Sequence, residues 1–199
     1  MKQISINGTA RTELGKKAAK AIRNSGNVPC VLYGEKKDAN GQPEAIHFSV
    51  SEKEINKLIY TPHIYLVDII IDGEDHKGIL KEVQFHPVKD NVLHVDFLEV
   101  HAEKPIVMGV PIAPQGLAEG VRAGGRLITM VRKLNVKALY SAIPEKLNID
   151  VTALQLGKSI KVGDLHFENL ELVTPKEVIV CTVKMTRAAM GAAAAAAKA

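Results

Sequence analysis

The sequence predicts a mainly β protein with minor α content, divided into two domains. Runs rich in Val and Ile are separated by Gly, Pro and Asn turns along most of the chain, which is typical of antiparallel sheets. One pair of runs flanks an Asp-Gly dipeptide, a strong signal for a hairpin. Two short segments instead show the spacing of a helix. The 199 residues can bury a substantial core, and their number alone allows one or two domains.

The chain opens with a strand at QISI, residues 3–6, and continues into a basic helix at residues 16–24. Lys16, Lys20 and Arg23 recur at i, i+4 and i+7, so they share one face of this helix. Gly26 is placed to end the helix, and Pro29 lies beyond it as a stop. The following VPCVLYG, residues 28–34, is predicted to be a strand.

A second helix is predicted to begin near Ser51, because Ser51 and Glu54 have the spacing of a capping box. Pro62 ends this helix, whose apolar stripe consists of Ile55, Leu58 and Ile59.

An antiparallel hairpin follows within residues 63–87. Its β-branched runs lie on both sides of Asp72-Gly73, the dipeptide that favours a tight two-residue turn. Residues 91–100, NVLHVDFLEV, add one more strand.

The pattern changes at residues 100–104, where the proline content rises, and this change marks a domain boundary. The first domain is predicted to span 1–100 and the second 104–187. Short strands at VMGVPIAP, LITMVRKLNVKAL, KLNIDV, KSIKVGDL and VIVCTV predict that the second domain is a small β-sandwich or roll. The Ala-rich residues 188–199 have no apolar stripe with which to pack, so we expect a frayed tail.

Composition excludes several classes of function. Aromatic residues make up 4% of the chain and Trp is absent, so no aromatic cofactor cage is expected, and we predict no cofactor. Cys30 and Cys181 lack zinc-ligand spacing and are expected to be buried or half-buried thiols. The start of the chain lacks the apolar region of a signal peptide, and no apolar run approaches the roughly 20 residues that span a bilayer, so we expect a cytoplasmic protein without membrane contact.

Charge is unevenly distributed along the sequence. Residues 1–37 carry eight Lys/Arg against two Asp/Glu, a net +6, whereas residues 38–100 carry a net −7 and residues 101–199 a net +5. The total of +4 therefore conceals a strongly basic start. Clustered positive charge of this kind is typical of proteins that bind phosphate backbones, although a run of charge is more often a solvated face.

His94 and Asp96 form the most specific short motif. On a strand these two residues lie on one face while Val95 and Phe97 lie on the other. The pair could donate and accept hydrogen bonds to an RNA base edge or ribose, and the aspartate would fix the imidazole tautomer. A purely structural His-Asp pair is the alternative.

An enzyme hypothesis has weak support. A metal-assisted RNA hydrolase could use His94 and Asp96, with His86 as a third member, but the chain has no GxSxG, HExxH or DxD motif and no Cys beside a His. The Gly-rich residues 120–127 lack the Lys-Ser/Thr of a phosphate loop and are interpreted as a tight turn. We predict no catalytic residue and no metal site.

Tyr33 and Gly34 end the strand that follows the basic helix. The ring could stack on a base or ribose and the glycine would permit close backbone approach, although a half-buried core tyrosine would give the same pattern. A basic face, a Tyr-Gly pair and a His-Asp pair within the first hundred residues together favour RNA binding.

RTELGKKAAKAIRNSGNVPCVLYG and EVQFHPVKDNVLHVDF resemble the bacterial large-subunit ribosomal proteins that bind 5S rRNA, the L25/Ctc (general stress protein) family. The segments VPIAPQGLAEGVRAGGRL and IPEKLNIDVTALQLGKSIKVGDL resemble the second domain of its longer, two-domain form. The resemblance implies an N-terminal antiparallel β-barrel with flanking helices that docks on loop E of 5S rRNA, largely from the minor-groove side.

The same resemblance implies one copy per large subunit and an RNA-binding role for nine residues. By matching motif position these are Arg11, Lys16, Lys20, Arg23, Tyr33, Gly34, Gln84, His94 and Asp96. This chain departs from the family where Arg is common, since it has Lys20, Ala21 and Asn24, and a Lys cannot make the bidentate or stacked contacts of an Arg. A constitutive structural component of the ribosome and a stress-linked protein that binds RNA conditionally both fit this pattern.

Overall fold

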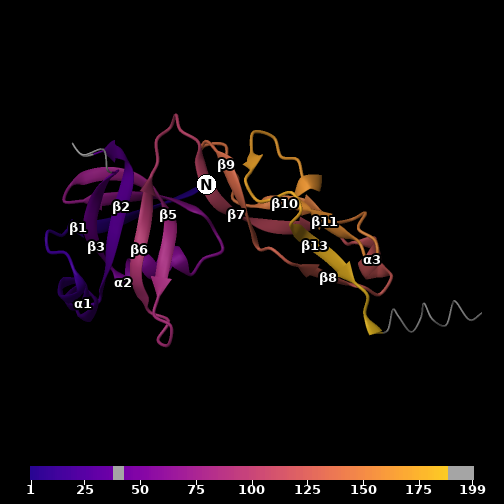
Figure 1. The fold of residues 1–199 in the computed structure, drawn as a ribbon, viewed down its shortest axis with the longest axis horizontal. Helices are drawn as coiled ribbons and strands as arrows, with labels where there is room; N and C mark the ends of the chain where they lie inside the picture. The colour runs from indigo at the N-terminus through magenta and orange to yellow at the C-terminus, as the bar shows by residue number, and fades with distance from the viewer. Residues whose placement is uncertain (38–42, 188–199) are drawn as a thin grey trace, which may run out of the picture. The chain divides into compact units, whose positions relative to one another are not determined.

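The computed structural model describes residues 1–37 and 43–187, and it divides the chain into a unit at Met1–Lys104 and a second at Pro105–Ala199. The expected tail at 188–199 lies outside the described residues. Within the described ranges, no helix is long and apolar enough to cross a membrane. Both units consist mainly of strands, so the predicted mainly β class is confirmed (Figure 1).

The first unit contains a closed barrel of six strands in the order β1-β3-β2-β6-β5-β4. The strands are β1 Lys2–Ala10, β2 Asn27–Lys37, β3 Pro43–Ser51, β4 Tyr65–Ile71, β5 Glu74–Phe85 and β6 Val92–Glu99. The pairs β1–β4 and β2–β6 are parallel and the other four are antiparallel. The barrel expected from the resemblance is therefore present. It is mostly antiparallel, and the parallel pairs β1–β4 and β2–β6 complete its closed order.

Apolar residues that alternate along these strands fill the barrel. Phe48 and Phe97 are completely buried, with ring centroids 5.9 Å apart. A Cβ atom on Gly8 would lie 2.6 Å from the Phe48 ring, so glycine at this position makes room for the core. Strand β3 was absent from the prediction, although its buried Ile46-x-Phe48-x-Val50 side follows the two-residue period of a strand.

The first helix begins and ends where the sequence predicts; the second begins one residue after Ser51 and ends at Ile59, before the predicted stop at Pro62. Helix α1 spans Lys16–Asn24, and Gly26 has the positive φ of a residue that follows a helix C-terminus. Helix α2 spans Glu52–Ile59 and packs Ile55 and Leu58 into the barrel core. Ser51 is the N-cap residue of α2, but its side chain makes no capping hydrogen bond, so the predicted capping box is wrong.

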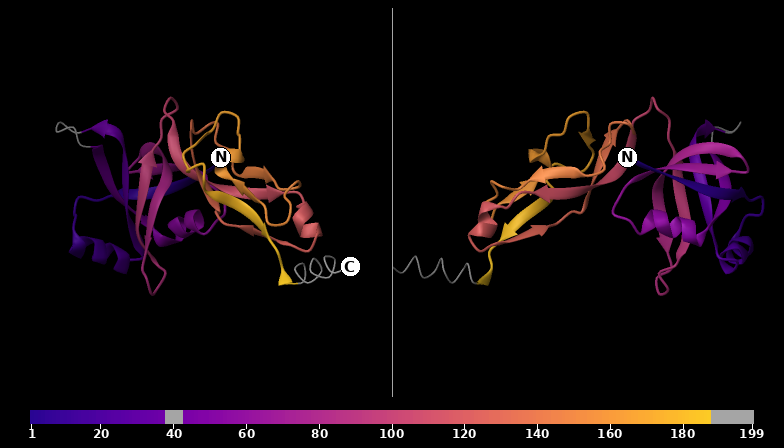
Figure 2. Two further views of the ribbon diagram at one scale, coloured as in Figure 1. Left: turned by 45° about the vertical axis from the view of Figure 1, so that its right-hand side comes forward. Right: turned by 180° about the vertical axis from the view of Figure 1, so that it is seen from behind.

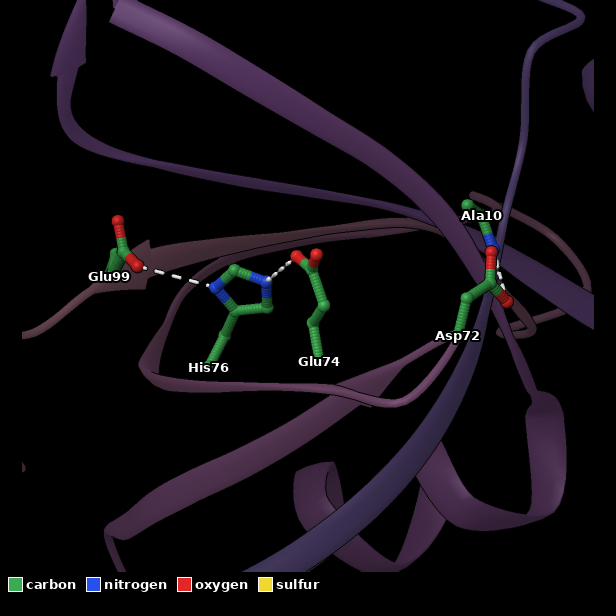
Figure 3. Close-up of polar contacts among 5 residues, drawn as sticks. All are labelled: Ala10, Asp72, Glu74, His76 and Glu99. Carbon is green, nitrogen blue, oxygen red and sulfur yellow. Dashed lines mark hydrogen bonds and ion pairs between the residues drawn. The ribbon is translucent and has the colours of Figure 1, made fainter.

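The predicted hairpin is formed by β4 and β5. Asp72 and Gly73 both have positive φ, as a type I′ turn requires, which explains the Asp-Gly dipeptide. The Asp72 carboxylate also accepts a hydrogen bond from the backbone N–H of Ala10 at 3.3 Å and so joins the turn to the end of β1 (Figure 3).

The second unit contains two separate sheets (Figure 2). The first has the order β10-β7-β9-β12, from strands Leu147–Asp150, Ile106–Gln115, Lys133–Ala138 and Glu171–Leu172. The second has the order β11-β13-β8, from strands Ser159–Lys161, Ile179–Lys184 and Arg126–Thr129. The completely buried residues of this unit come from both sheets and include Val110, Leu134, Val136 and Val183.

Three predictions for this unit need correction. LITMVRKLNVKAL is not one strand, because β8 and β9 belong to different sheets and the chain turns outward between them at Met130, which is 57% exposed. Residues 120–127 are not a simple tight turn, since the short helix α3, Glu119–Arg122, begins before Gly124 and Gly125. The predicted strand KSIKVGDL ends at Lys161 and continues as the single 3₁₀ turn η1, Val162–Asp164.

Both cysteines are free and buried, as the sequence predicts. Burial raises the pKa of the Cys30 thiol to about 12, and burial also raises the pKa of Cys181. Because a thiolate is the reactive form, neither side chain is suited to redox or nucleophilic chemistry.

Candidate nucleic-acid interface

One outer wall of the barrel carries most of the polar residues singled out in the sequence. On β6 the buried Val95 and Phe97 point into the core, so His94 and Asp96 point outward. The strand register places Gln84 of β5 beside His94, and it places Val31 of β2 beside Asp96. The strands β2, β6 and β5 lie side by side in Figure 1 and form the base of this surface.

His94 and Asp96 are hydrogen-bonded to each other. The distance between His94 Nδ1 and Asp96 Oδ1 is 2.7 Å, and the side chains are 24% and 26% exposed. An ionised carboxylate only accepts hydrogen bonds, so Nδ1 carries the proton and Nε2 of the neutral ring is an acceptor. The remaining carboxylate oxygen, Oδ2, is left to accept a hydrogen bond from a ligand.

Tyr33 lies on the same wall and is half-buried. Partial burial raises the pKa of its phenol, and the neighbouring carboxylates of Asp96 and Glu82 raise it further. The hydroxyl is therefore kept neutral, as a hydrogen-bond donor and acceptor, beside a ring face that can stack on a base or a ribose.

His47 also belongs to this surface, and the sequence analysis did not single it out. The register places it beside Val31, and its carbonyl accepts a hydrogen bond from the backbone N–H of Arg11 at 3.0 Å. Among the residues that the structure describes, His47 Nδ1 and Arg11 Nε are buried atoms without a hydrogen-bond partner. Burial lowers the pKa of His47, and the nearby Arg11 and His94 lower it further.

Helix α1 contributes the basic part of the site. Lys16 and Lys20 are exposed, whereas Arg23 is half-buried and its Nε donates a hydrogen bond to the carbonyl of Leu93 at 3.0 Å. Leu93 precedes His94 on the chain. Arg23 therefore joins the last turn of the basic helix to the strand that carries the His-Asp pair, and it leaves the two lysines pointing into solvent.

Comparison with known proteins identifies the family. The Ribosomal L25p family model matches residues 6–97, and the model for the C-terminal domain of ribosomal protein TL5 matches residues 105–187. The large ribosomal subunit protein bL25 of Phocaeicola vulgatus is 59% identical over 198 residues, and the alignment covers the whole of both chains. Proteins of the same name are 55% identical in Bacteroides fragilis, over the whole of both chains, and 56% identical in Porphyromonas gingivalis, over 97% and 98%.

The chain belongs to the ribosomal L25p family. Membership confirms the resemblance found in the sequence, including the two-domain form, since the two family models match the two halves of the chain in order. The L25p family consists of structural ribosomal proteins, so the prediction that the chain is not an enzyme is also confirmed.

The proposed third member of a hydrolase site has another role in this L25p protein. His86 Nδ1 accepts hydrogen bonds from the backbone N–H groups of Val88 and Lys89, each at 3.2 Å, and so stabilises the turn between β5 and β6. Over residues 1–37 and 43–187, no group of three or more His, Cys, Asp or Glu side chains is arranged to hold a metal ion.

Gly34 lies at the end of the wall, against a different polar cluster. A Cβ atom on Gly34 would lie 2.6 Å from Glu99 Oε2 and 2.7 Å from Glu99 Cβ. Glu99 in turn contacts the buried His76 at 3.4 Å, and Glu74 lies on the other side of the His76 ring at 3.7 Å (Figure 3). The packing of Glu99 is thus a sufficient reason for glycine at position 34.

The structure therefore divides the nine predicted residues into three groups. Five lie on or beside the outer wall: Arg11, Tyr33, Gln84, His94 and Asp96. Lys16, Lys20 and Arg23 belong to the adjoining helix α1, and Gly34 packs against Glu99. The wall also brings in His47 and Glu82, which were not among the nine predicted residues; His47 lies on β3, a strand that the sequence did not predict.

We expect Gly34→Ala to destabilise the first unit by about 1–3 kcal/mol, because the added methyl group displaces Glu99 from its packed position. Gly109→Ala is the matched control, since its Cβ would meet no atom closer than 3.4 Å. Thermal unfolding would measure both. A Gly34→Ala protein as stable as wild type that binds RNA poorly would instead assign this glycine to the RNA contact.

We expect His47→Gln to reduce the loss of stability at acidic pH. The folded state lowers the pKa of His47 below its ordinary value of 6.5, so the unfolded chain binds more protons and stability falls as the pH drops below 6.5. Glutamine does not titrate, so the variant should lose less stability than wild type between pH 8 and pH 5. Melting temperatures at both pH values measure this difference.

His166→Gln, which removes an exposed histidine of the second unit, is the control for that experiment. Equal acid sensitivity of wild type and His47→Gln would show that His47 does not titrate in this range.

Proposed function

We propose that this chain is a non-catalytic structural component of the large ribosomal subunit, in the bacterial cytoplasm, and that one copy binds 5S rRNA at loop E through its first unit. The observation that carries the proposal is the outward-facing wall of Tyr33, His94 and Asp96 joined to a basic helix. The relatives named large ribosomal subunit protein bL25 support the assignment to the large subunit. The family resemblance supports 5S rRNA as the partner.

The two parts of the site have different tasks in this proposal. Lys16 and Lys20 are exposed cations on one helix face, suited to phosphate contacts that hold the protein in register but carry no sequence information. The wall presents a phenol, an imidazole nitrogen, an amide and a carboxylate oxygen, which match base edges and ribose hydroxyls in a wide minor groove. The Arg23–Leu93 hydrogen bond fixes the distance between the two parts.

Asp96 is the most informative residue of the wall, because a carboxylate near RNA is repelled by phosphates unless it accepts a hydrogen bond. Its Oδ1 holds His94, and Oδ2 is available to a guanine amino group or a ribose hydroxyl. The carboxylate would thus orient the imidazole and contact the RNA at the same time.

Asp96→Ala should weaken binding to 5S rRNA by about 1–3 kcal/mol, which is roughly 5-fold to 150-fold, because it removes an acceptor from a desolvated donor. Glu82→Ala is the matched control, since Glu82 is an exposed carboxylate that lies opposite Asp96 in the register of β5 and β6. Loss of the Glu82 charge should leave binding unchanged or slightly tighter. Fluorescence anisotropy with 5S rRNA and with an unrelated RNA of equal length measures both effects.

A folded Asp96→Ala protein that binds 5S rRNA as tightly as wild type would remove Asp96 from the interface. A protein with a lowered melting temperature whose folded fraction binds normally would make the His94–Asp96 pair a structural feature only.

Lys16→Gln and Lys20→Gln should each lower the slope of log affinity against log salt by about 0.7–0.9, because each lysine displaces counterions from the RNA. Preference for 5S rRNA over the unrelated RNA should hardly change. Lys57→Gln, on the exposed side of α2, is the control and should leave the slope as it is. If either α1 variant bound unrelated RNA normally and failed only on 5S rRNA, that lysine would be reading bases.

A further inference from the structure

The positive charge of the second unit is concentrated on segments that the fold brings together. Residues 117–130, 153–161 and 179–187 hold α3, β8, β11 and β13, and together they carry six Lys/Arg against one acidic residue, Glu119. The remainder of residues 105–187 carries five Lys/Arg against six Asp/Glu. The net charge of the unit therefore lies almost entirely on the three-stranded sheet and its short helix.

Five exposed cations gather where β8 begins and β13 ends. The register pairs Arg126 of β8 directly with Lys184 of β13, so their side chains project from the same face of the sheet. The carbonyl of Lys158 accepts hydrogen bonds from the backbone N–H of Val183 at 3.1 Å and from the Thr182 hydroxyl at 3.2 Å, which holds Lys158 against the end of β13. We name these cations the basic patch: Arg122, Arg126, Lys158, Lys184 and Arg187.

Helix α3 and the residues after β13 complete the patch. The Thr186 hydroxyl donates a hydrogen bond to the carbonyl of Gly124 at 2.6 Å. Gly124 lies two residues after Arg122, and Thr186 immediately precedes Arg187. The same hydrogen bond therefore brings the chain segments of these two arginines together at one end of the sheet, which Figure 1 shows beside α3.

The patch is not neutralised by ion pairs within residues 1–37 and 43–187. None of its five members forms an ion pair with any residue in the described part of the chain, whereas Lys137 on the other sheet is paired with Glu171 at 3.1 Å. Two like charges directly opposite each other on an antiparallel pair destabilise the sheet. An external polyanion would attract both Arg126 and Lys184 and so offset the repulsion between them.

The chemistry of the surface selects the kind of anion. All five side chains are exposed, so the patch does not enclose a small phosphate ligand. The three segments contain no Phe, Tyr or Trp, so they offer no ring on which an unpaired base could stack. Lysines and arginines without aromatic residues are suited to the phosphate backbone of folded RNA, which is contacted without regard to sequence.

We propose that the second unit binds the phosphate backbone of ribosomal RNA through this basic patch, separately from the 5S rRNA contact of the first unit. The affinity of the whole protein for the large subunit then has two electrostatic sources, one in each unit. Neither contact depends on the other for its chemistry.

The test compares two full-length double variants that remove the same charge. Arg126→Gln/Lys184→Gln alters the patch, and Lys133→Gln/Lys137→Gln alters exposed lysines of β9 in the other sheet. Each is titrated with deproteinised large-subunit rRNA at several salt concentrations. The patch variant should lower the slope of log affinity against log salt by about 0.7–0.9 per lost contact, and the β9 variant should change it much less.

An unchanged slope for the patch variant, or equal changes for both variants, would overturn the proposal. It would also be overturned if the patch variant bound intact large subunits more weakly but bound free rRNA as wild type does. That last result would indicate an acidic protein partner. Melting temperatures guard against misfolding, and the patch variant should melt at or above the wild-type temperature because a like-charge pair is removed. Asp96→Ala reports only on the first unit, so failure of the 5S rRNA proposal is distinguishable from failure of this one.

Discussion

Closure of the six-stranded barrel determines the direction of every side chain on β6. Val95 and Phe97 point into the core. Because side chains alternate along a strand, His94 and Asp96 must point to the outside of the barrel. Closure through parallel β2–β6 pairing then brings Tyr33 and His47 within one or two strands of that pair. The polar wall is thus a consequence of how the core is packed, and a register shift of one residue would remove it.

The basic helix depends on the same strand. Helix α1 buries no residue completely, so packing alone holds it weakly, and the hydrogen bond from Arg23 Nε to the Leu93 carbonyl supplies a directional attachment to β6. This gives Arg23 a task that Lys could not perform in the same way, because the guanidinium keeps further N–H groups after Nε is used. The positions where this chain has Lys20, Ala21 and Asn24 carry no comparable attachment, which fits contacts made through flexible lysines.

Local signals predicted part of this structure well. The bounds of α1, the Asp-Gly hairpin and the outward His-Asp pair follow from residue spacing, since turn geometry and side-chain alternation are properties of a few neighbouring residues. Strand β3 has only a short apolar alternation, Ile46, Phe48 and Val50, that begins after a proline and runs directly into the helix signal at Ser51, so local spacing did not predict it. Barrel closure and the break between β8 and β9 depend on pairing between distant strands, which residue spacing does not encode; only the family resemblance indicated the barrel.

Several acidic residues of the first unit lie close to the proposed interface. Asp72 accepts a hydrogen bond from the backbone N–H of Ala10, which precedes Arg11. Glu74 lies 3.7 Å from His76, in the cluster that packs against Gly34. Residues 38–100 carry a net −7 along the sequence, whereas residues 1–37, which include α1, carry a net +6. An RNA that approaches is attracted by α1 and repelled by these carboxylates, so the charge distribution favours one orientation before any base is contacted. Asp96 and Glu82 lie on the wall itself, and their local repulsion of phosphate favours a groove edge with hydrogen-bond donors over bare backbone at that point.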